Sequence, residues 1–142
     1  MINRYFILLS VICVLMVSCA GKSMIGGNQT FQRQWMLTAL PGTTYEELLK
    51  AKAEINLTNV NSPTAFGGCN KMFFTAKTGK TGEIDFSNIG ATKMYCIDVM
   101  KVEDAIKQTL PLVRSYEIEG HKIFFKNEAG DIIIKAVAAD WD

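Results

Sequence analysis

The 142-residue sequence has few of the side chains that bind metals or carry out nucleophilic catalysis. It contains one histidine, His121, and four cysteines, without a Cys-x-x-Cys or His-Glu-x-x-His spacing. A Gly-x-Ser-x-Gly sequence and a phosphate-binding glycine loop are also missing. We therefore expect no metal, no cofactor and no enzymatic activity. His121 follows Gly120 in an expected hairpin, which favours an exposed turn residue over a catalytic base.

The acidic side chains give no stronger indication of an active site. Adjacent carboxylates occur at 46–47 and 103–104, with a further pair at 117 and 119. They fall at a helix start or on expected polar faces, where solvation explains them. A nucleophilic Cys69 with His121 as its base is an alternative, although a disulfide is the simpler use of that cysteine.

An excess of charge of either sign is absent. The sequence has 15 Lys and Arg residues, and without Arg4 of the N-terminal segment 14 remain against 14 Asp and Glu. This balance gives no basis for a nucleic-acid partner. There is no internal repeat and no low-complexity run, so the length predicts one domain.

The N-terminal segment has the pattern of an export signal. Arg4 is the only charge before residue 22, and residues 5–17 are apolar apart from Ser10. This run is too short to cross a bilayer, which takes about 20 residues. Residues 15–19 resemble a bacterial lipoprotein processing site, which implies a signal peptide at 1–18 and a lipid on Cys19. The alternatives are cleavage near residue 18 or 20 that releases a soluble protein, and an uncleaved anchor.

A lipidated Cys19 would hold the mature protein on a membrane, because each buried methylene contributes about 0.8 kcal/mol. No acidic residue follows Cys19 closely, since the next residues are Ala20, Gly21 and Lys22. We therefore expect the outer membrane, facing the periplasm, if the source is a bacterium with two membranes. Residues 19–32 are interpreted as a flexible tether and 139–142 as a C-terminal tail.

The rest of the chain predicts an α+β fold that is mostly β. Short segments rich in β-branched and aromatic residues, separated by Gly, Asn or Pro turns, predict strands at 33–39, 53–59, 64–69, 72–77, 83–86, 113–119, 122–126 and 131–137. Apolar residues at helical spacing predict one main helix over 98–110, with Asp98 as its cap and Pro111 after its end. A capping box at Thr44 and Glu47 predicts a short helix through residue 50. The spacing suggests a meandering antiparallel sheet.

Four short motifs resemble the META domain family, which includes the HslJ-like lipoproteins of bacterial envelopes. They are WML at 35–37, GGCN at 67–70, ATKMYC at 91–96 and SYEIEG at 115–120. The resemblance covers residues 33–138 and implies an open antiparallel barrel or strongly bent sheet with a helix packed against it. It also implies that the motifs have structural roles: a bulge or a close backbone approach at Gly67 and Gly68, and Trp35 in the core.

Cys69 and Cys96 are the only cysteines outside the N-terminal segment and its lipidation site. In an exported protein they form a single even pair, and a disulfide between them is the simplest interpretation. Two buried thiols retained for packing are the alternative, because sequence does not show whether their Cα atoms approach closely.

Two pairs of adjacent aromatic residues predict a second apolar face. Strand alternation places Phe74 and Phe125 inward, and their neighbours Phe73 and Phe124 on the other side. In the last strand we expect Ile132 and Ile134 to point inward. The outward residues predict a candidate binding face for a hydrophobic partner, a peptide strand or lipid headgroups, formed by Lys71, Phe73, Lys77, Lys122, Phe124 and Lys126. The alternative is that helix 98–110 covers this face while the lysines extend to solvent.

Two functions fit these observations. The first is a non-enzymatic, lipid-anchored binding or interaction module of the cell envelope, which the resemblance to HslJ-like proteins links to stress tolerance of the cell surface. The second is a carrier or chaperone for an acyl chain or another apolar ligand inside an open β-barrel, an analogy at the level of fold. A packed interior would favour the first function, and an apolar cavity would favour the second.

Overall fold

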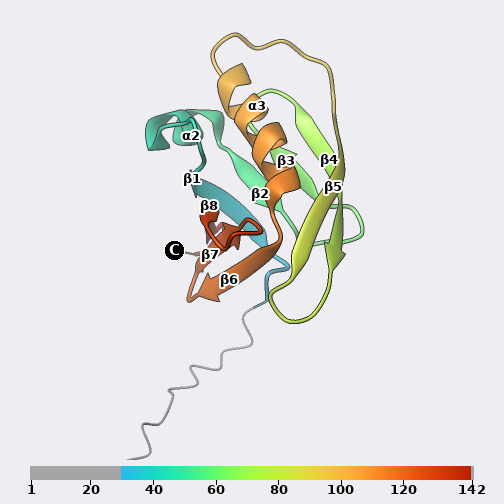
Figure 1. Cartoon of the computed structure of the whole chain (residues 1–142). Coiled ribbons are helices and arrows are strands. Elements are labelled where there is room, and N and C mark those ends of the chain that lie inside the picture. Colours follow the sequence, from blue (N-terminus) through green and yellow to red (C-terminus); the bar gives the residue numbers. More distant parts are fainter. Residues whose placement is uncertain (1–29, 142) are drawn as a thin grey trace, which may run out of the picture.

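An antiparallel sheet of eight strands curls into a half-barrel in the computed structural model, which describes residues 30–141 (Figure 1). The strands are β1 (Gln34–Ala39), β2 (Glu54–Asn56), β3 (Thr64–Phe66), β4 (Lys71–Thr78), β5 (Ile84–Ala91), β6 (Ser115–Glu119), β7 (Lys122–Lys126) and β8 (Ile132–Ala138). Their order across the sheet is β5-β4-β3-β2-β1-β8-β7-β6. The predicted fold class is confirmed, whereas the export signal, Cys19 and most of the tether lie outside the described residues.

The two edge strands of the sheet, β5 and β6, meet at one end. There the backbone N–H of Ile84 donates to the carbonyl of Arg114 (3.2 Å), and the N–H of Tyr116 donates to the carbonyl of Gly82 (2.8 Å). Further along, β5 has no strand on its outer side among the described residues, and the main helix α3 (Met100–Thr109) lies across the concave side of the sheet (Figure 1). The half-barrel is therefore pinned at one end of its seam and open at the other.

The core fills the concave side of the sheet. Trp35, Ile55 and Met72 point into it from the strands, and Val102 and Ile106 join them from α3. Trp35 is fully buried, as the sequence predicts, and its indole N–H donates to the carbonyl of Phe31 at 2.8 Å. Phe31, which we assigned to the tether, also packs on Tyr116 with ring centroids 5.1 Å apart.

The two helices begin in different ways. At α2 (Tyr45–Ala51) the predicted capping box is present: Glu47 N–H donates to Thr44 Oγ1 at 3.2 Å, and Thr44 N–H donates to the Glu47 carboxylate at 2.8 Å. At α3 the predicted cap Asp98 is wrong, because Val99 occupies the N-cap position and the Asp98 carboxylate instead pairs with Lys50 at 3.6 Å. A 3₁₀ turn, η2 (Leu110–Leu112), follows α3. Neither described helix is long and apolar enough to cross a membrane.

The inward direction predicted for Ile132 is wrong. Phe125 pairs with Ile134 and Lys126 pairs with Ile132, so Ile133 is an extra residue on β8. This bulge reverses the alternation at the start of the strand, and Ile132 is exposed while Ile134 is buried.

His121 is not the exposed turn residue that we expected. Its ring lies against Trp141 with centroids 3.4 Å apart, and its Nδ1 is buried without a hydrogen-bond partner among the described residues. The cause is the pairing of β8 with the start of β7: Ala138 N–H donates to the His121 carbonyl at 2.9 Å, which brings the last described residues across the hairpin. Trp141 of the expected C-terminal tail therefore packs on the domain.

Candidate functional site

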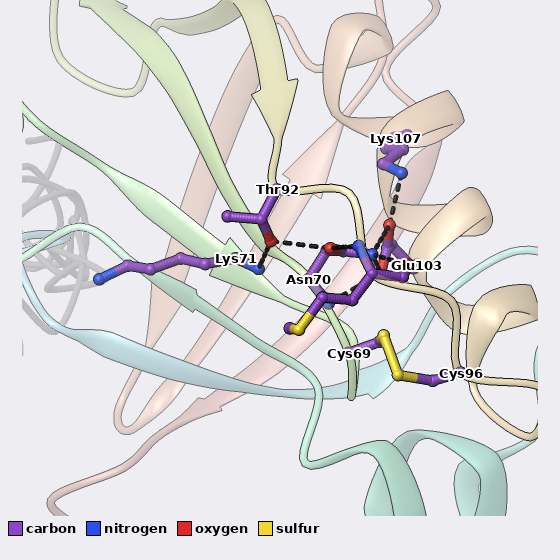
Figure 2. The surroundings of a disulfide bond; sticks show 8 residues. Cys69, Asn70, Lys71, Thr92, Cys96, Glu103 and Lys107 are labelled. Carbon is purple, nitrogen blue, oxygen red and sulfur yellow. Dashed lines mark hydrogen bonds and ion pairs between the residues drawn. A yellow bond between two sulfur atoms is a disulfide. The ribbon is translucent and has the colours of Figure 1, made fainter.

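A disulfide joins Cys69 and Cys96, whose Cα atoms lie 5.9 Å apart (Figure 2). Cys69 lies in the turn between β3 and β4, and Cys96 lies in the loop between β5 and α3, which we call the 92–98 loop. The bond fixes this loop to the sheet at a point 27 residues away in sequence. The pairing predicted from the cysteine count is thus present in the structure.

The two glycines of the GGCN motif let the helix approach the sheet. A Cβ at Gly67 would lie 2.9 Å from the Cα of Glu103 in α3, and a Cβ at Gly68 would lie 2.8 Å from the Cβ of Val99. Gly68 also has a φ of +101°, which residues with a side chain rarely adopt. Both positions therefore require glycine.

Asn70 holds the 92–98 loop through both atoms of its amide. Its Oδ1 accepts hydrogen bonds from the Thr92 hydroxyl and the Met94 N–H, both at 2.7 Å. Its Nδ2 donates to the Met94 carbonyl at 2.8 Å. Because Asn70 is itself buried, these bonds fix both the N–H and the C=O of Met94 against the sheet.

The carboxylate of Glu103 lies on the other side of Asn70 and is completely buried. It accepts hydrogen bonds from the Asn70 N–H (3.0 Å), from Asn70 Nδ2 (3.0 Å) and from the Lys107 ammonium (2.5 Å). Burial raises the pKa of Glu103, but the bonds from Lys107 and Asn70 outweigh it and hold the pKa below its ordinary 4.5. The carboxylate is therefore charged at neutral pH and binds the helix to the turn.

Sequence reasoning placed Glu103 on a polar face, and this was wrong. The available signal was its position in the helix: Glu103 directly follows Val102 and precedes Ile106 by one turn, so it lies beside the apolar stripe. Lys107 at the i+4 position marks the partner that neutralises it.

The structure separates the two halves of the predicted binding face. Lys71, Phe73 and Lys77 lie on β4, whereas Lys122, Phe124 and Lys126 lie on β7, with β3, β2, β1 and β8 between them in the sheet. On β4, Phe73 is 49% exposed and both lysines are exposed. On β7, Phe124 is half-buried and the Lys126 ammonium pairs with the Glu117 carboxylate at 2.6 Å. Helix α3 does not cover Phe73, since it packs on the opposite, concave side with Phe74.

The most exposed apolar side chains belong to the 92–98 loop, which sequence reasoning treated only as a carrier of Cys96. Met94 is 58% exposed, Tyr95 79% and Ile97 80%. The start of β4 adjoins this loop, because Lys71 N–H donates to the Thr92 hydroxyl (3.2 Å) and Thr92 N–H donates to the Lys71 carbonyl (3.1 Å). The β4 half of the predicted face and the loop are therefore neighbours.

The clefts around the sheet are shallow and open to solvent. One of about 730 Å³ lies beside the open part of the seam, between β5 and η2. Its lining includes Asp85, Ser87, Asn88, Lys107, Pro111 and Arg114. The Arg114 guanidinium lies 3.5 Å from the Asp85 carboxylate, and the Lys107 ammonium pairs with Glu103, so the charges of this cleft are largely balanced internally.

Comparison with known proteins gives the family. The family model of the META domain matches residues 28–140, which is most of the chain. The chain belongs to the META domain family. The resemblance drawn from the four motifs is thereby confirmed. In this META domain the motifs at 67–70 and 91–96 are joined to each other by the disulfide and by the hydrogen bonds of Asn70.

Two solved structures share the fold of this META domain. An NMR structure of a protein from Burkholderia xenovorans is 17% identical, covers 78% of this chain and 83% of its own, and has a TM-score of 0.58. A second NMR structure is 16% identical, covers 82% of this chain and 97% of its own, and has a TM-score of 0.59. At these identities the likeness shows the fold alone. No curated protein matches the sequence.

Proposed function

We propose that this META domain is a non-enzymatic binding module of the cell envelope, held on the periplasmic face of the outer membrane by a lipid on Cys19. The observation that carries the proposal is the 92–98 loop, which is fixed at both Met94 and Cys96 and yet exposes three large apolar side chains. Rigid, exposed apolar groups of this kind suit binding, because little conformational entropy is lost when they are covered. A role in envelope stress tolerance follows from the HslJ-like resemblance.

The disulfide and the N-terminal segment support the location. Disulfides persist in the periplasm and outside the cell and are rare in the cytosol. Residues 1–18 have the pattern of a signal, and Ser18 and Cys19 end it as in a lipoprotein. Both features are those of an exported chain.

The acyl-carrier alternative is less well supported by the interior of the domain. Trp35, Met72 and Phe125 are fully buried and fill the concave side of the sheet together with α3. An acyl chain bound there would have to displace them. Extraction of the purified domain with organic solvent and mass spectrometry tests this alternative, since a stoichiometric fatty acid in the extract would favour a carrier.

The anchor is tested by Cys19→Ala, with Cys13→Ala as the matched control. Because Cys19 is the proposed site of acylation, the Cys19→Ala protein should accumulate as an unprocessed precursor and take up no labelled palmitate. The Cys13→Ala protein should be labelled and fractionate with membranes as the natural chain does. Labelling of the Cys19→Ala protein at the natural level would overturn the anchor.

A further inference from the structure

The 92–98 loop is built to keep apolar side chains in solvent. Asn70 binds the backbone of Met94 on both sides, and the disulfide fixes Cys96, so the residues next to them cannot fold back onto the domain without breaking these bonds. Removing a side chain of the size of Met or Ile from water is favourable. A clustered set of such groups on a rigid loop marks a surface that is covered in use.

The flank of the loop is aromatic and basic. Phe73 lies two residues after Lys71, whose backbone bonds Thr92 at the start of the loop, and the Lys71 ammonium lies 5.8 Å from the Phe73 ring centroid. Lys71 and Lys93 form no ion pair with any residue that the structure describes, whereas Asp98, the acidic residue of the loop, pairs with Lys50. The exposed apolar groups are thus bordered by positive charge without a counter-ion.

We infer that Met94, Tyr95 and Ile97, together with Phe73, form a membrane-contact surface that inserts into the headgroup region of an anionic phospholipid bilayer. The aliphatic side chains reach the acyl boundary, and the Tyr95 ring, apolar with a polar tip, suits the interface itself. Lys71 and Lys93 then lie at the level of the lipid phosphates and attract anionic headgroups.

The proposed anchor is compatible with this orientation, and to that extent the inference rests on the proposed function. The first described residues lie at the end of the domain opposite to the loop (Figure 1). A domain of this size is about 35 Å across. The chain from Cys19 to residue 30 spans at most about 36–40 Å when extended. The lipid and the loop can therefore occupy the same leaflet when the tether is fully extended along the domain.

Vesicle binding by the chain from residue 20 tests the inference, because this chain has no lipid and contains every strand, helix and core residue of the described domain. Co-sedimentation is measured with vesicles of phosphatidylglycerol mixed with phosphatidylethanolamine, and with vesicles of phosphatidylcholine alone. We expect binding to the anionic vesicles that is weakened by salt. The triple variant Met94→Ser, Tyr95→Ser, Ile97→Ser should lose at least about tenfold in affinity.

Two further variants make the outcome specific. Lys71→Gln with Lys93→Gln should remove the preference for anionic vesicles, and Ile132→Ser, which changes an exposed apolar residue on β8, should bind as the natural chain does. The thermal midpoint of each variant should stay unchanged, since the altered side chains are exposed.

The inference would be overturned if the unsubstituted chain from residue 20 did not bind anionic vesicles, including the case in which the loop captures only a protein. Equal binding by the triple variant would also overturn it. Neither result depends on acylation of Cys19, which palmitate labelling measures separately.

Discussion

Glu103 carries a negative charge inside the domain because three donors surround its carboxylate. Two come from Asn70 in the turn before β4, and the third is the Lys107 ammonium one turn along the same helix. Removing a donor from a buried charge costs several kcal/mol, because the charge is left without compensation. The network therefore fixes the helix in one position on the turn rather than simply adding attraction between them.

The lowered pKa of Glu103 makes part of the stability depend on pH. Because its folded-state pKa lies below the ordinary 4.5, its contribution is complete above about pH 4.5 and is lost as the pH falls through the folded-state pKa. Glu103→Gln should lower the free energy of unfolding at neutral pH by about 1.5–3 kcal/mol. Its difference from the natural chain should shrink as the pH falls below 4.5. Urea unfolding at a series of pH values measures both effects.

Glu128→Gln is the matched control for this prediction, because Glu128 is exposed in the turn before β8. It should leave the urea midpoint at neutral pH nearly unchanged. A Glu103→Gln protein as stable as the Glu128→Gln protein would show that the buried carboxylate contributes nothing.

Gly67 and Gly90 offer a direct comparison between a crowded and an open glycine. A Cβ at Gly67 would meet the backbone of Glu103 at 2.9 Å, whereas a Cβ at Gly90 has nothing within 4 Å. Gly67→Ala should therefore push α3 from the sheet and destabilise the domain by about 1–3 kcal/mol. Gly90→Ala should change the urea midpoint little. Equal midpoints for the two variants would contradict the close packing of α3.

At the scale of the element, the strands obey the period of two except where a bulge interrupts it. Phe74 and Phe125 point into the core and stack there through Phe86, with ring centroids 5.0 Å and 5.7 Å apart. Between Phe125 and Lys126 the pairing shifts, and Ile132 turns outward. Alternation thus predicts side-chain direction within a regular stretch and fails across a bulge, because one extra residue exchanges the two faces.

The direction of each aromatic residue can be measured through stability. Phe74→Ala and Phe125→Ala should each cost about 3–5 kcal/mol, because they remove a buried ring from a packed core. Phe73→Ala should cost little, since about half of that residue is exposed. The midpoints of urea unfolding give the comparison. A loss at Phe73 as large as that at Phe74 would mean that another segment covers the outer face of β4.

The sequence contains enough local information to predict most helices and strands, but too little to predict the contacts between them. Each of the eight strands forms near its predicted position, and the capping box of α2 forms as predicted, because both depend on neighbouring residues. The contact of His121 with Trp141 joins two segments, and no local pattern reports it. The burial of Glu103 needs Asn70, which lies 33 residues away, although the place of Glu103 beside the apolar stripe of its helix is visible in the sequence. The residues of the predicted binding face lie on two strands, β4 and β7, that are not neighbours in the sheet, and strand order is likewise not a local property.

At the scale of the whole molecule, the disulfide closes a loop that contains two long strands. β4 and β5 lie between Cys69 and Cys96. In the unfolded state the cross-link therefore restricts the conformations of the whole segment that forms these two strands. In the chain-entropy account, closing a loop of 27 residues stabilises a domain by about 3.5 kcal/mol. This is a large share of the stability expected for a domain of this size.

Replacing both cysteines by serine should therefore lower the free energy of unfolding by about 3.5 kcal/mol. The variant should still fold, because Asn70 and Glu103 continue to bind the loop and the helix to the turn. Urea unfolding measures the loss. Intact mass of the natural chain, purified from an oxidising compartment, should show two hydrogens missing. Full thiol labelling of Cys69 and Cys96 after unfolding without reductant would rule out the bond.

The irregular edge of β5 affects whether a strand of another copy of the protein can pair with it. Beyond the pinned end of the seam, β5 presents backbone groups that no strand covers among the described residues. Within that stretch the pairing with β4 shifts, and Asn88 adopts a φ of +53°. The shift interrupts the regular spacing of outward N–H and C=O groups on which an added strand depends. A neighbouring copy therefore meets an interrupted edge at β5 rather than a continuous strand on which to add its own.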